Sequence, residues 1–396
     1  MTSDLGNELR TQLDRWLVSH GAELVALRRD LHAHPELSKH EQGTTAKIAA
    51  LLEAAGLKPR LLPTGNGIIC DIPGDPAGPV VALRADMDAL PIQDAKDVPY
   101  KSTVDGVCHA CGHDVHTTVA LGAGLALAEM GGLRGTVRLV FQPAEEVFDG
   151  GAPDMIDAGA LDGVSRIFAV HCDPRIAAGL VGIRVGPLTA SADSIRVTLA
   201  GPGGHTARPY LTADVVEAIG RVVTEVPALL GRRTDPRSGV SLVFGAIHAG
   251  QAANTIPQAA YALGTVRILD HDAWSSAPTL ISQLVHEVVA PTRATADITY
   301  TRGVPPVVNE PGATGILAEA ARAGLGADAV VGTPQSMGGE DFSWYLEHVP
   351  GSMARLGVGR PGEQLDLHQG TFDVDERAIA TGVRLLAHTA VAALAG

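Results

Sequence analysis

PVVALRAD at residues 79–86 and GTVRLVFQPAEE at residues 135–146 decide the fold, with HDVHTTVALGAGLALAEMG at residues 113–131 between them. The outer two are short apolar runs rich in β-branched and aliphatic residues, which is typical of buried strands in a largely parallel sheet. The middle stretch predicts a helix, with Asp114 capping its start and Gly131 following its end. Because a strand, a helix and a strand follow one another, we expect an α/β domain with a helix-covered sheet.

The same patterns extend outward from this unit. SRIFAVHCD at residues 165–173 predicts a third strand, and residues 8–30 and 42–56 predict amphipathic helices. Near residue 188 the pattern changes to an alternating strand, a helix, two strands, a helix and a final strand. That order is the split βαβ arrangement of a ferredoxin-like module.

Two domains explain these patterns. Residues 1–187 and 300–396 are expected to form the α/β domain, and residues 188–299 are expected to form an inserted ferredoxin-like α+β domain. A chain of 396 residues has the length for two such domains.

Composition excludes several classes of function. The chain has 30 Lys and Arg against 44 Asp and Glu, a net charge of −14, so we expect no binding to nucleic acid or to anionic membranes. Aromatic residues make up only 4% of the chain, too few for platforms that stack single-stranded bases. No window approaches the roughly 18 apolar residues of a membrane span, and the first residues do not resemble a signal peptide. We therefore expect a cytoplasmic protein, in which the four cysteines do not form disulfides.

Residue types that commonly bind metal ions follow the three predicted strands. Asp86 and Asp88 follow the first strand, Glu145 and Glu146 the second, and His171 the third. Because the carboxyl ends of parallel strands share one edge of a sheet, these side chains are expected to meet there. The loop before the predicted helix adds further polar residues at the same edge: His109, Cys111, His113, Asp114 and His116. Thiolate, imidazole and carboxylate together form a set of ligands for a divalent transition metal.

Each of these residues, taken alone, also has a simpler interpretation than a metal site. Cys108 and Cys111 form a CxxC pair that is compatible with a redox site, and no second CxxC exists to complete a four-cysteine zinc site. A lone His171 is more often structural than a ligand. The coincidence of these residues at the ends of three strands favours the metal site.

Four motifs in this order resemble the metallopeptidases of family M20: ALRADMDALPI (82–92), HACGHDVHTT (109–118), FQPAEE (141–146) and SMGGEDF (336–342). LHAHPELSKHE at residues 31–41 also matches the opening motif of that family. The similarity is greatest to its amidohydrolase branch, subfamily D, which contains hippurate hydrolases, N-acyl-amino-acid hydrolases and auxin-conjugate hydrolases. The resemblance implies a catalytic domain with an inserted lid.

Two divalent metal ions, Zn, Mn, Co or Ni, are implied by the resemblance. The residues that match the ligand motifs of the family are Cys111, His113, Glu146, His171 and His368. Cys111 is then shared between the ions, and Glu145 is the general base. Asp88 matches a carboxylate that orients a ligand in other branches. Supporting roles without metal binding are expected for Asp86, His32, His34 and His116.

The predicted lid contributes three residues that match family motifs for substrate binding. They are His205 in GPGGHTARP, Asn254 in QAANTIP and Arg267 in GTVRILD. The resemblance implies that Asn254 and Arg267 bind the substrate carboxylate, for which the arginine fork is suited. It also implies a homodimer, or a dimer of dimers, in which His205 reaches the active site of the partner subunit.

These observations predict a metal-dependent amidohydrolase that cleaves a small-molecule N-acyl or N-aroyl amino acid. The alternatives are a dipeptidase or aminopeptidase on the same scaffold, a metal-binding protein without turnover, and a thiol redox protein that uses Cys108 and Cys111. Glu145 argues against binding without turnover, because such a site has no need of a base beside a ligand. The sequence leaves the acyl group and the physiological metal open.

Overall fold

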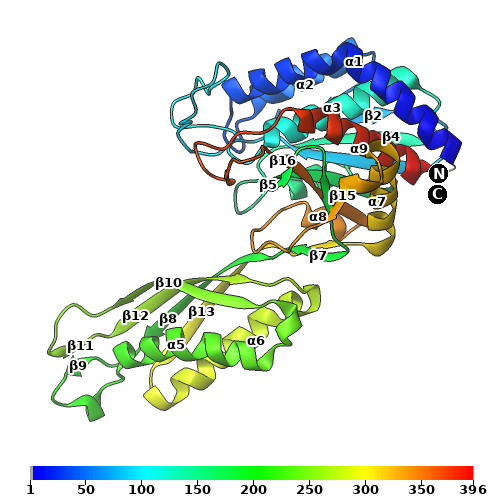
Figure 1. Ribbon diagram of the computed structural model, residues 1–396. Helices are drawn as coiled ribbons and strands as arrows, with labels where there is room; N and C mark the ends of the chain where they lie inside the picture. Colours follow the sequence, from blue (N-terminus) through cyan, green and yellow to red (C-terminus); the bar gives the residue numbers. More distant parts are fainter. Residues whose placement is uncertain (1–2, 396) are drawn as a thin grey trace. The chain divides into compact units, whose positions relative to one another are not determined.

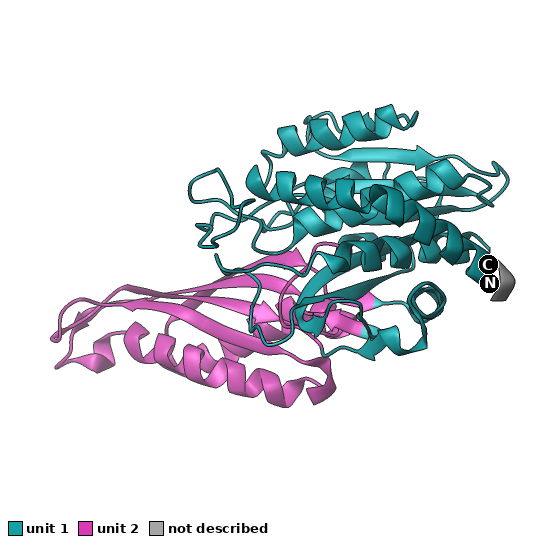
Figure 2. Ribbon diagram, turned by 45° about the horizontal axis from the view of Figure 1, so that its top comes forward, with its two compact units in different colours: residues 1–186, 309–334, 344–396 teal, residues 187–308, 335–343 magenta. Residues whose placement is uncertain are grey.

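The computed structural model describes residues 3–395, and the chain divides into two compact units (Figure 2). Unit 1 comprises residues 1–186, 309–334 and 344–396, and unit 2 comprises residues 187–308 and 335–343. The chain enters unit 2 at β7 (Gly186–Thr189) and leaves it at β14 (Val307–Asn309), and these strands pair with each other. It returns to unit 2 for residues 335–343. The expected boundary at 299/300 falls inside strand β13 (Thr295–Val304), and unit 2 continues to residue 308.

Unit 1 is built on an eight-stranded mixed sheet in the order β1-β2-β4-β3-β5-β16-β6-β15. The four central strands run parallel to one another, whereas β2 is antiparallel to β4 and β6 is antiparallel to β16. The prediction of a largely parallel sheet is therefore confirmed for its centre. The strands are β1 (Arg60–Leu61), β2 (Ile68–Ile72), β3 (Val80–Asp86), β4 (Thr136–Gln142), β5 (Val164–Ala177), β6 (Val181–Ile183), β15 (Val330–Gly332) and β16 (Gly351–Gly359).

Helices cover this sheet, as Figure 1 shows for α1, α3 and α9. Apolar side chains from the helices and the strands form one core, in which Leu13, Val119, Leu139, Phe168 and Leu386 are fully buried. Each such side chain stabilises the folded state by roughly 1.5–3 kcal/mol through burial. The helices are α1 (Ser3–Ala33), α2 (Gln42–Ala54), α3 (His113–Met130), α4 (Ala152–Asp157), α7 (Pro311–Leu325), α9 (Arg377–Leu394) and, at the boundary of the units, α8 (Ser343–Leu346).

The start of α3 differs from the prediction that Asp114 caps it. Gly112 is the N-cap residue, with φ +89°, and no side chain caps the helix. Asp114 is buried, and its Oδ2 forms an ion pair at 2.8 Å with Arg28 of α1, while its Oδ1 accepts the backbone N–H of the next residue, Val115, at 3.0 Å. A Cβ atom at Gly112 would lie 2.7 Å from Cys172 Sγ, so this position requires glycine. The predicted end is confirmed, because Gly131 is the C-cap with φ +62°.

Unit 2 contains a four-stranded antiparallel sheet in the order β10-β12-β8-β13, with α5 and α6 packed on it. In chain order the elements are β8, α5, β10, β12, α6 and β13, which is the predicted ferredoxin-like arrangement. A short pair, β9 and β11, lies beside them. The bounds are β8 (Ala192–Ala200), β9 (Gly204–His205), α5 (Val215–Arg233), β10 (Ser241–Ala249), β11 (Thr255–Ile256), β12 (Ala259–Arg267), α6 (His271–Val289) and β13 (Thr295–Val304).

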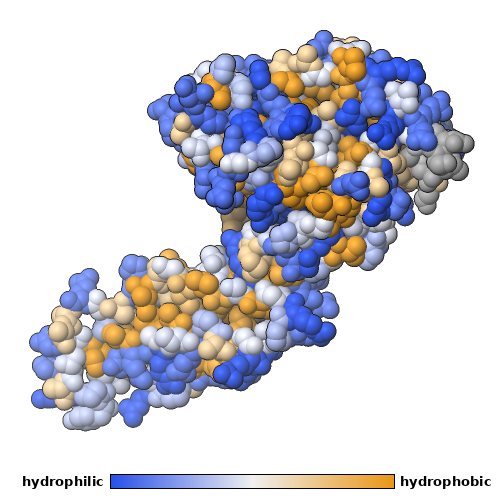
Figure 3. Space-filling model, viewed as in Figure 1, coloured by the Kyte–Doolittle hydropathy of each residue, from blue (hydrophilic) through white to orange (hydrophobic). Residues whose placement is uncertain are grey.

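Strand β10 is an edge strand of this sheet and carries exposed apolar side chains. Val243 and Ile247 of β10, with Leu263 of the neighbouring β12, are exposed, and Figure 3 shows apolar surface over this part of unit 2. An unpaired edge with apolar side chains favours pairing with another chain.

Among the helices of the described residues, none is long and apolar enough to cross a membrane.

Candidate metal centre

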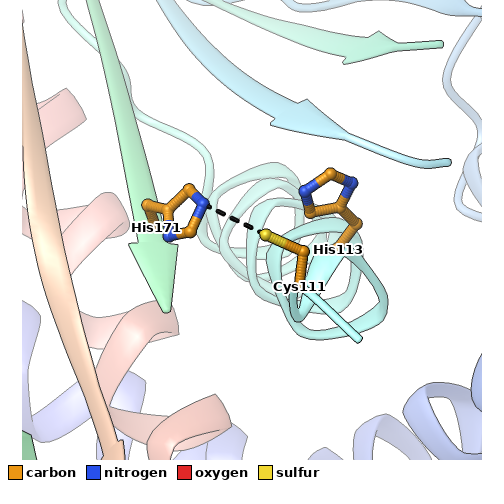
Figure 4. A group of neighbouring side chains, drawn as sticks. All are labelled: Cys111, His113 and His171. Carbon is orange, nitrogen blue, oxygen red and sulfur yellow. Dashed lines mark hydrogen bonds between the residues drawn. The ribbon is translucent and has the colours of Figure 1, made fainter. Parts of the chain in front are cut away.

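The side chains predicted at the strand ends meet in unit 1. Among the described residues, Cys111, His113 and His171 form one group whose ligand atoms lie within 4.8 Å of one another (Figure 4). Cys111 also belongs to a second such group, with Glu146 and His368, and His113 to another, with the two glutamates Glu145 and Glu146. All five predicted ligands and the predicted base thus lie in one cluster.

His171 of β5 presents one ring nitrogen to Cys111. Its Nδ1–H donates to the backbone carbonyl of Cys172 at 2.8 Å, which fixes the tautomer and leaves Nε2 3.5 Å from Cys111 Sγ. Burial and the nearby Arg355 cation hold the pKa of His171 well below its usual range, so the ring is neutral at pH 7. A neutral imidazole with its Nε2 lone pair turned toward a thiol is in the form that binds a metal ion.

His113, the first residue of α3, is oriented by Asp88. Its Nδ1 lies 3.2 Å from Asp88 Oδ1, and its Nε2 lies 3.8–3.9 Å from oxygens of Asp86, Glu145 and Glu146. Burial lowers the pKa of His113, but the carboxylates of Asp86 and Asp88 outweigh burial and raise this pKa to about 10. His113 Nε2 is buried and has no hydrogen-bond partner among the described residues. A cation between this nitrogen and the carboxylates would satisfy both, so the residues fit a metal ion.

Cys111 shows the same surplus of negative charge. Burial raises the pKa of the thiol well above its usual range, and the carboxylates of Glu146 and Glu145 raise it further. A thiolate is therefore unfavourable in the protein alone, whereas a bound divalent ion deprotonates a coordinating thiol. Together with the imidazole and carboxylate groups, this thiol favours a transition metal over Mg²⁺ or Ca²⁺.

The carboxylate of Asp88 is fully engaged within the protein. Oδ1 faces His113, while Oδ2 accepts hydrogen bonds from Ser38 Oγ at 2.6 Å and from the backbone N–H of Glu146 at 2.9 Å. These partners suit an orienting role for Asp88 rather than proton transfer.

Asp86 and His116 form another close group with His113, but neither ring nitrogen of His116 is available to a metal ion. Nδ1–H donates to Asp86 Oδ1 at 2.6 Å, and Nε2 accepts the backbone N–H of Cys172 at 2.8 Å. Asp86 also binds Arg84 at 2.6 Å. This geometry agrees with the supporting roles expected for both residues.

His368 reaches the cluster from a loop near the end of the chain. Its backbone has φ +60°, and its N–H donates to the carbonyl of Ala110 at 2.8 Å. The ring Nε2 lies 3.4 Å from Glu146 Oε1, and this contact with the carboxylate raises the pKa of His368. A non-glycine residue with positive φ is strained by about 1–2 kcal/mol, and such strain concentrates at functional sites.

His32 and His34 of the opening motif lie outside the metal cluster. His32 is buried, with Nδ1–H donating to Asp114 at 2.7 Å, and it supports the ion pair between Asp114 and Arg28. His34 is exposed and bonds to the Asp30 carbonyl at 2.9 Å. No role was expected for Glu41, the last residue of this motif. Its carboxylate accepts a hydrogen bond from the backbone N–H of Ala144.

Unit 2 brings two of the three predicted substrate residues together. The backbone N–H of Thr206 donates to the carbonyl of Asn254 at 3.2 Å, so His205 and Asn254 lie on neighbouring segments, and both are exposed. Arg267 is the last of the nine residues of β12, and Asn254 precedes the first. At about 3.3 Å per residue β12 alone is roughly 26 Å long, and Asn254 lies five residues before its start. One small substrate cannot touch all three residues of a single unit 2.

Comparisons with known proteins agree with this cluster. The model of peptidase family M20/M25/M40 matches residues 82–392. A putative glutamate–cysteine ligase from Rhodococcus jostii is 47% identical over 97% of this chain, which spans about half (48%) of that protein. An N-acetyl-L-cysteine deacetylase from Bacillus subtilis is 38% identical over 90% of this chain and 85% of its own length. The crystal structure of YxeP from Bacillus subtilis, described as a dinuclear metal-binding peptidase, is 35% identical, covers 95% of this chain and 99% of its own, and superimposes with a TM-score of 0.84.

Proposed function

The chain belongs to peptidase family M20/M25/M40 and is a metal-dependent hydrolase, as its similarity to a deacetylase and to a dinuclear metal-binding peptidase supports. On this premise we propose that it hydrolyses the amide bond of N-acyl amino acids. The observation that carries the proposal is the cluster of Cys111, His113, Glu145 and Glu146, in which a thiol, an imidazole and two adjacent carboxylates converge. The deacetylases among the relatives support cleavage of an acyl group from an amino acid.

Two ions would share the cluster. Cys111, His113 and His171 would hold one ion, and Cys111, Glu146 and His368 would hold the other. Bound metal lowers the pKa of the attacking water toward about 7 and polarises the scissile carbonyl. Zinc, manganese, cobalt and nickel all suit these ligands.

Glu145 is the proposed general base. Its Oε2 lies 3.9 Å from His113 Nε2, at the edge of the cluster, while the adjacent Glu146 faces His368. Glu145 takes the proton of the attacking water and delivers it to the leaving amine, a role worth typically 10²–10⁴ in rate.

The lid residues support a homodimer, or a dimer of dimers, in which each active site draws on two subunits. Arg267 ends β12, a strand roughly 26 Å long, whereas Asn254 and the neighbouring His205 lie before its start, so we assign the two sets to different sites. Arg267 then binds the substrate carboxylate as a bidentate fork, and His205 of the other subunit stabilises the oxyanion. The exposed apolar edge at β10 supports pairing of two unit 2 sheets.

A hydrolysis screen tests the proposal. Metal-stripped protein is reloaded separately with Zn²⁺, Mn²⁺, Co²⁺ or Ni²⁺ and offered N-acetyl, N-benzoyl and indole-acyl amino acids, N-acetyl-L-cysteine among them. Unblocked dipeptides serve as the control substrates. We expect release of free amino acid from at least one acylated substrate, abolished in the stripped protein. Cleavage of dipeptides alone would favour a dipeptidase, and metal binding without any cleavage would favour a protein without turnover.

A further inference from the structure

The turn that carries Glu145 is strained at the preceding residue. Ala144 has φ +57°, in the left-handed region that residues with a Cβ atom rarely adopt. This conformation costs roughly 1–2 kcal/mol, so contacts around the turn must hold it in place.

One carboxylate oxygen, Glu41 Oε1, provides such a contact. It accepts the backbone N–H of Ala144 at 2.7 Å and that of Lys39 at 3.0 Å. Lys39 is also a non-glycine residue in the left-handed region, with φ +69°. A single buried side chain therefore stabilises two strained positions that lie 105 residues apart in the sequence (39 and 144).

The other side of Glu145 is fixed in the same way. The backbone N–H of Glu146 donates to Asp88 Oδ2 at 2.9 Å. The N–H groups of the residues before and after Glu145 are thus held by two separate carboxylates, Glu41 and Asp88.

The burial of the Glu41 carboxylate costs free energy of folding. Its second oxygen, Oε2, is buried without a hydrogen-bond partner in the described part of the chain. Burial, together with the nearby Asp88 carboxylate, raises the pKa of Glu41 to about 7. A buried oxygen without a partner costs about 1–3 kcal/mol, which is unusual outside functional sites.

From these contacts we infer that Glu41 is a positioning residue for Glu145, setting the backbone from which the general base reaches the attacking water. The inference rests on the proposed function, in which Glu145 is that base. A misplacement of about 1 Å at such a residue can cost 10²-fold in rate.

The test compares Glu41→Ala with Glu36→Ala. Glu36 is the matched control, because it lies in the same loop and its two oxygens accept the N–H groups of Gly43 and Thr44 at 2.9 and 2.7 Å, away from the turn. We expect Glu41→Ala to lower kcat at least about 10-fold with KM and metal content unchanged, and Glu36→Ala to leave kcat unchanged. Glu41→Gln keeps an acceptor oxygen and should restore most of kcat.

Amide hydrogen exchange gives a second measurement that needs no substrate. Exchange of the Ala144 N–H should become faster in Glu41→Ala and remain slow in Glu41→Gln and Glu36→Ala. Unchanged exchange in Glu41→Ala, or faster exchange with normal kcat, would overturn the inference. If the wild-type protein cleaves no acylated substrate, the proposed function fails, while the exchange measurement still decides whether Glu41 holds the turn.

Discussion

His116 Nε2 accepts a hydrogen bond from the backbone N–H of Cys172 at 2.8 Å. The carbonyl of the same Cys172 accepts the Nδ1–H of His171 at 2.8 Å. A chain of hydrogen bonds therefore runs from Asp86 through the buried His116 to the strand that presents His171, the proposed ligand.

Replacing His116 should weaken metal binding although it is not a ligand. In His116→Phe the Cys172 N–H loses its acceptor and Asp86 keeps only Arg84, so the backbone to which His171 bonds is held less firmly. We expect metal affinity to fall 10–100-fold, the usual effect of removing such a partner. Calorimetric titration of the stripped protein with Zn²⁺ measures it. Wild-type affinity in the variant would show that β5 positions His171 by itself.

Substitutions at the adjacent Glu145 and Glu146 should have different effects on turnover and on metal content. Glu145→Gln removes the base but keeps the size of the side chain, so turnover should fall at least about 10² with metal content unchanged. Glu146→Gln removes a ligand, so metal content should fall as well. Metal analysis and steady-state kinetics on both variants check this. Near-normal turnover in Glu145→Gln would reject Glu145 as the base.

Cys111 and Cys108 should respond differently to serine. Cys111 belongs to two groups of candidate ligands, whereas Cys108 is buried beside Leu90 and belongs to no candidate group among the described residues. Cys111→Ser should therefore lower metal occupancy, and Cys108→Ser should leave it unchanged. Equal effects of the two substitutions on occupancy would instead support a CxxC pair.

Subunit mixing should restore activity if His205 acts across a dimer. Glu145→Gln and His205→Ala are each expected to be inactive. After dissociation and reassociation, half of the dimers would be mixed, and each mixed dimer would contain one intact site. Activity should return to roughly a quarter of the wild-type value. Proven subunit exchange without recovery would place His205 in its own subunit or outside the site.

Acid should destabilise the fold through His388 of α9. Its side chain is fully buried, and burial, with Arg10, lowers its pKa to about 4. The unfolded chain has the ordinary pKa near 6.5, so below pH 6.5 it binds a proton that the folded protein does not. The contribution of neutral His388 to the free energy of unfolding is therefore complete above pH 6.5 and is lost as the pH falls toward 4. His388→Leu should reduce this loss in free energy of unfolding by up to roughly 3 kcal/mol.

Urea denaturation between pH 7 and pH 4 measures the effect. His286→Leu, at an exposed position of α6, is the control and should keep the wild-type slope. The same slope in both variants would mean that His388 does not contribute.

Periodicity and strand ends predicted much of the fold and the cluster. Asp86, Glu145 and His171 follow or lie within apolar runs that form the parallel centre of the sheet, and the ferredoxin-like order of unit 2 is visible as alternation. The assignment of Asp114 as a helix cap was wrong because its partner, Arg28, lies 86 residues earlier, and only the tertiary fold brings this charge to it.

Contacts to the backbone account for what the sequence did not predict. Glu41 and His116 act on peptide N–H groups of Ala144 and Cys172, and every residue type except proline offers such a group, so no residue pattern marks the partner. Residues 335–343 belong to unit 2 for the same kind of reason, since the backbone of Ala190 bonds to that of Ser336.

The position of β16 sets the order in which the protein can mature on the ribosome. This strand, residues 351–359, lies between β5 and β6 inside the sheet of unit 1, although unit 2 is synthesised between β6 and β16. Unit 2 has nearly all of its chain by residue 308 and can begin folding as it emerges, whereas the central sheet stays open until β16 arrives. His368 emerges later still, so a metal centre that includes His368, as proposed, is complete only after residue 368 has been synthesised. Until then the nascent chain exposes the flanks of β5 and β6, which is when it most needs protection by chaperones.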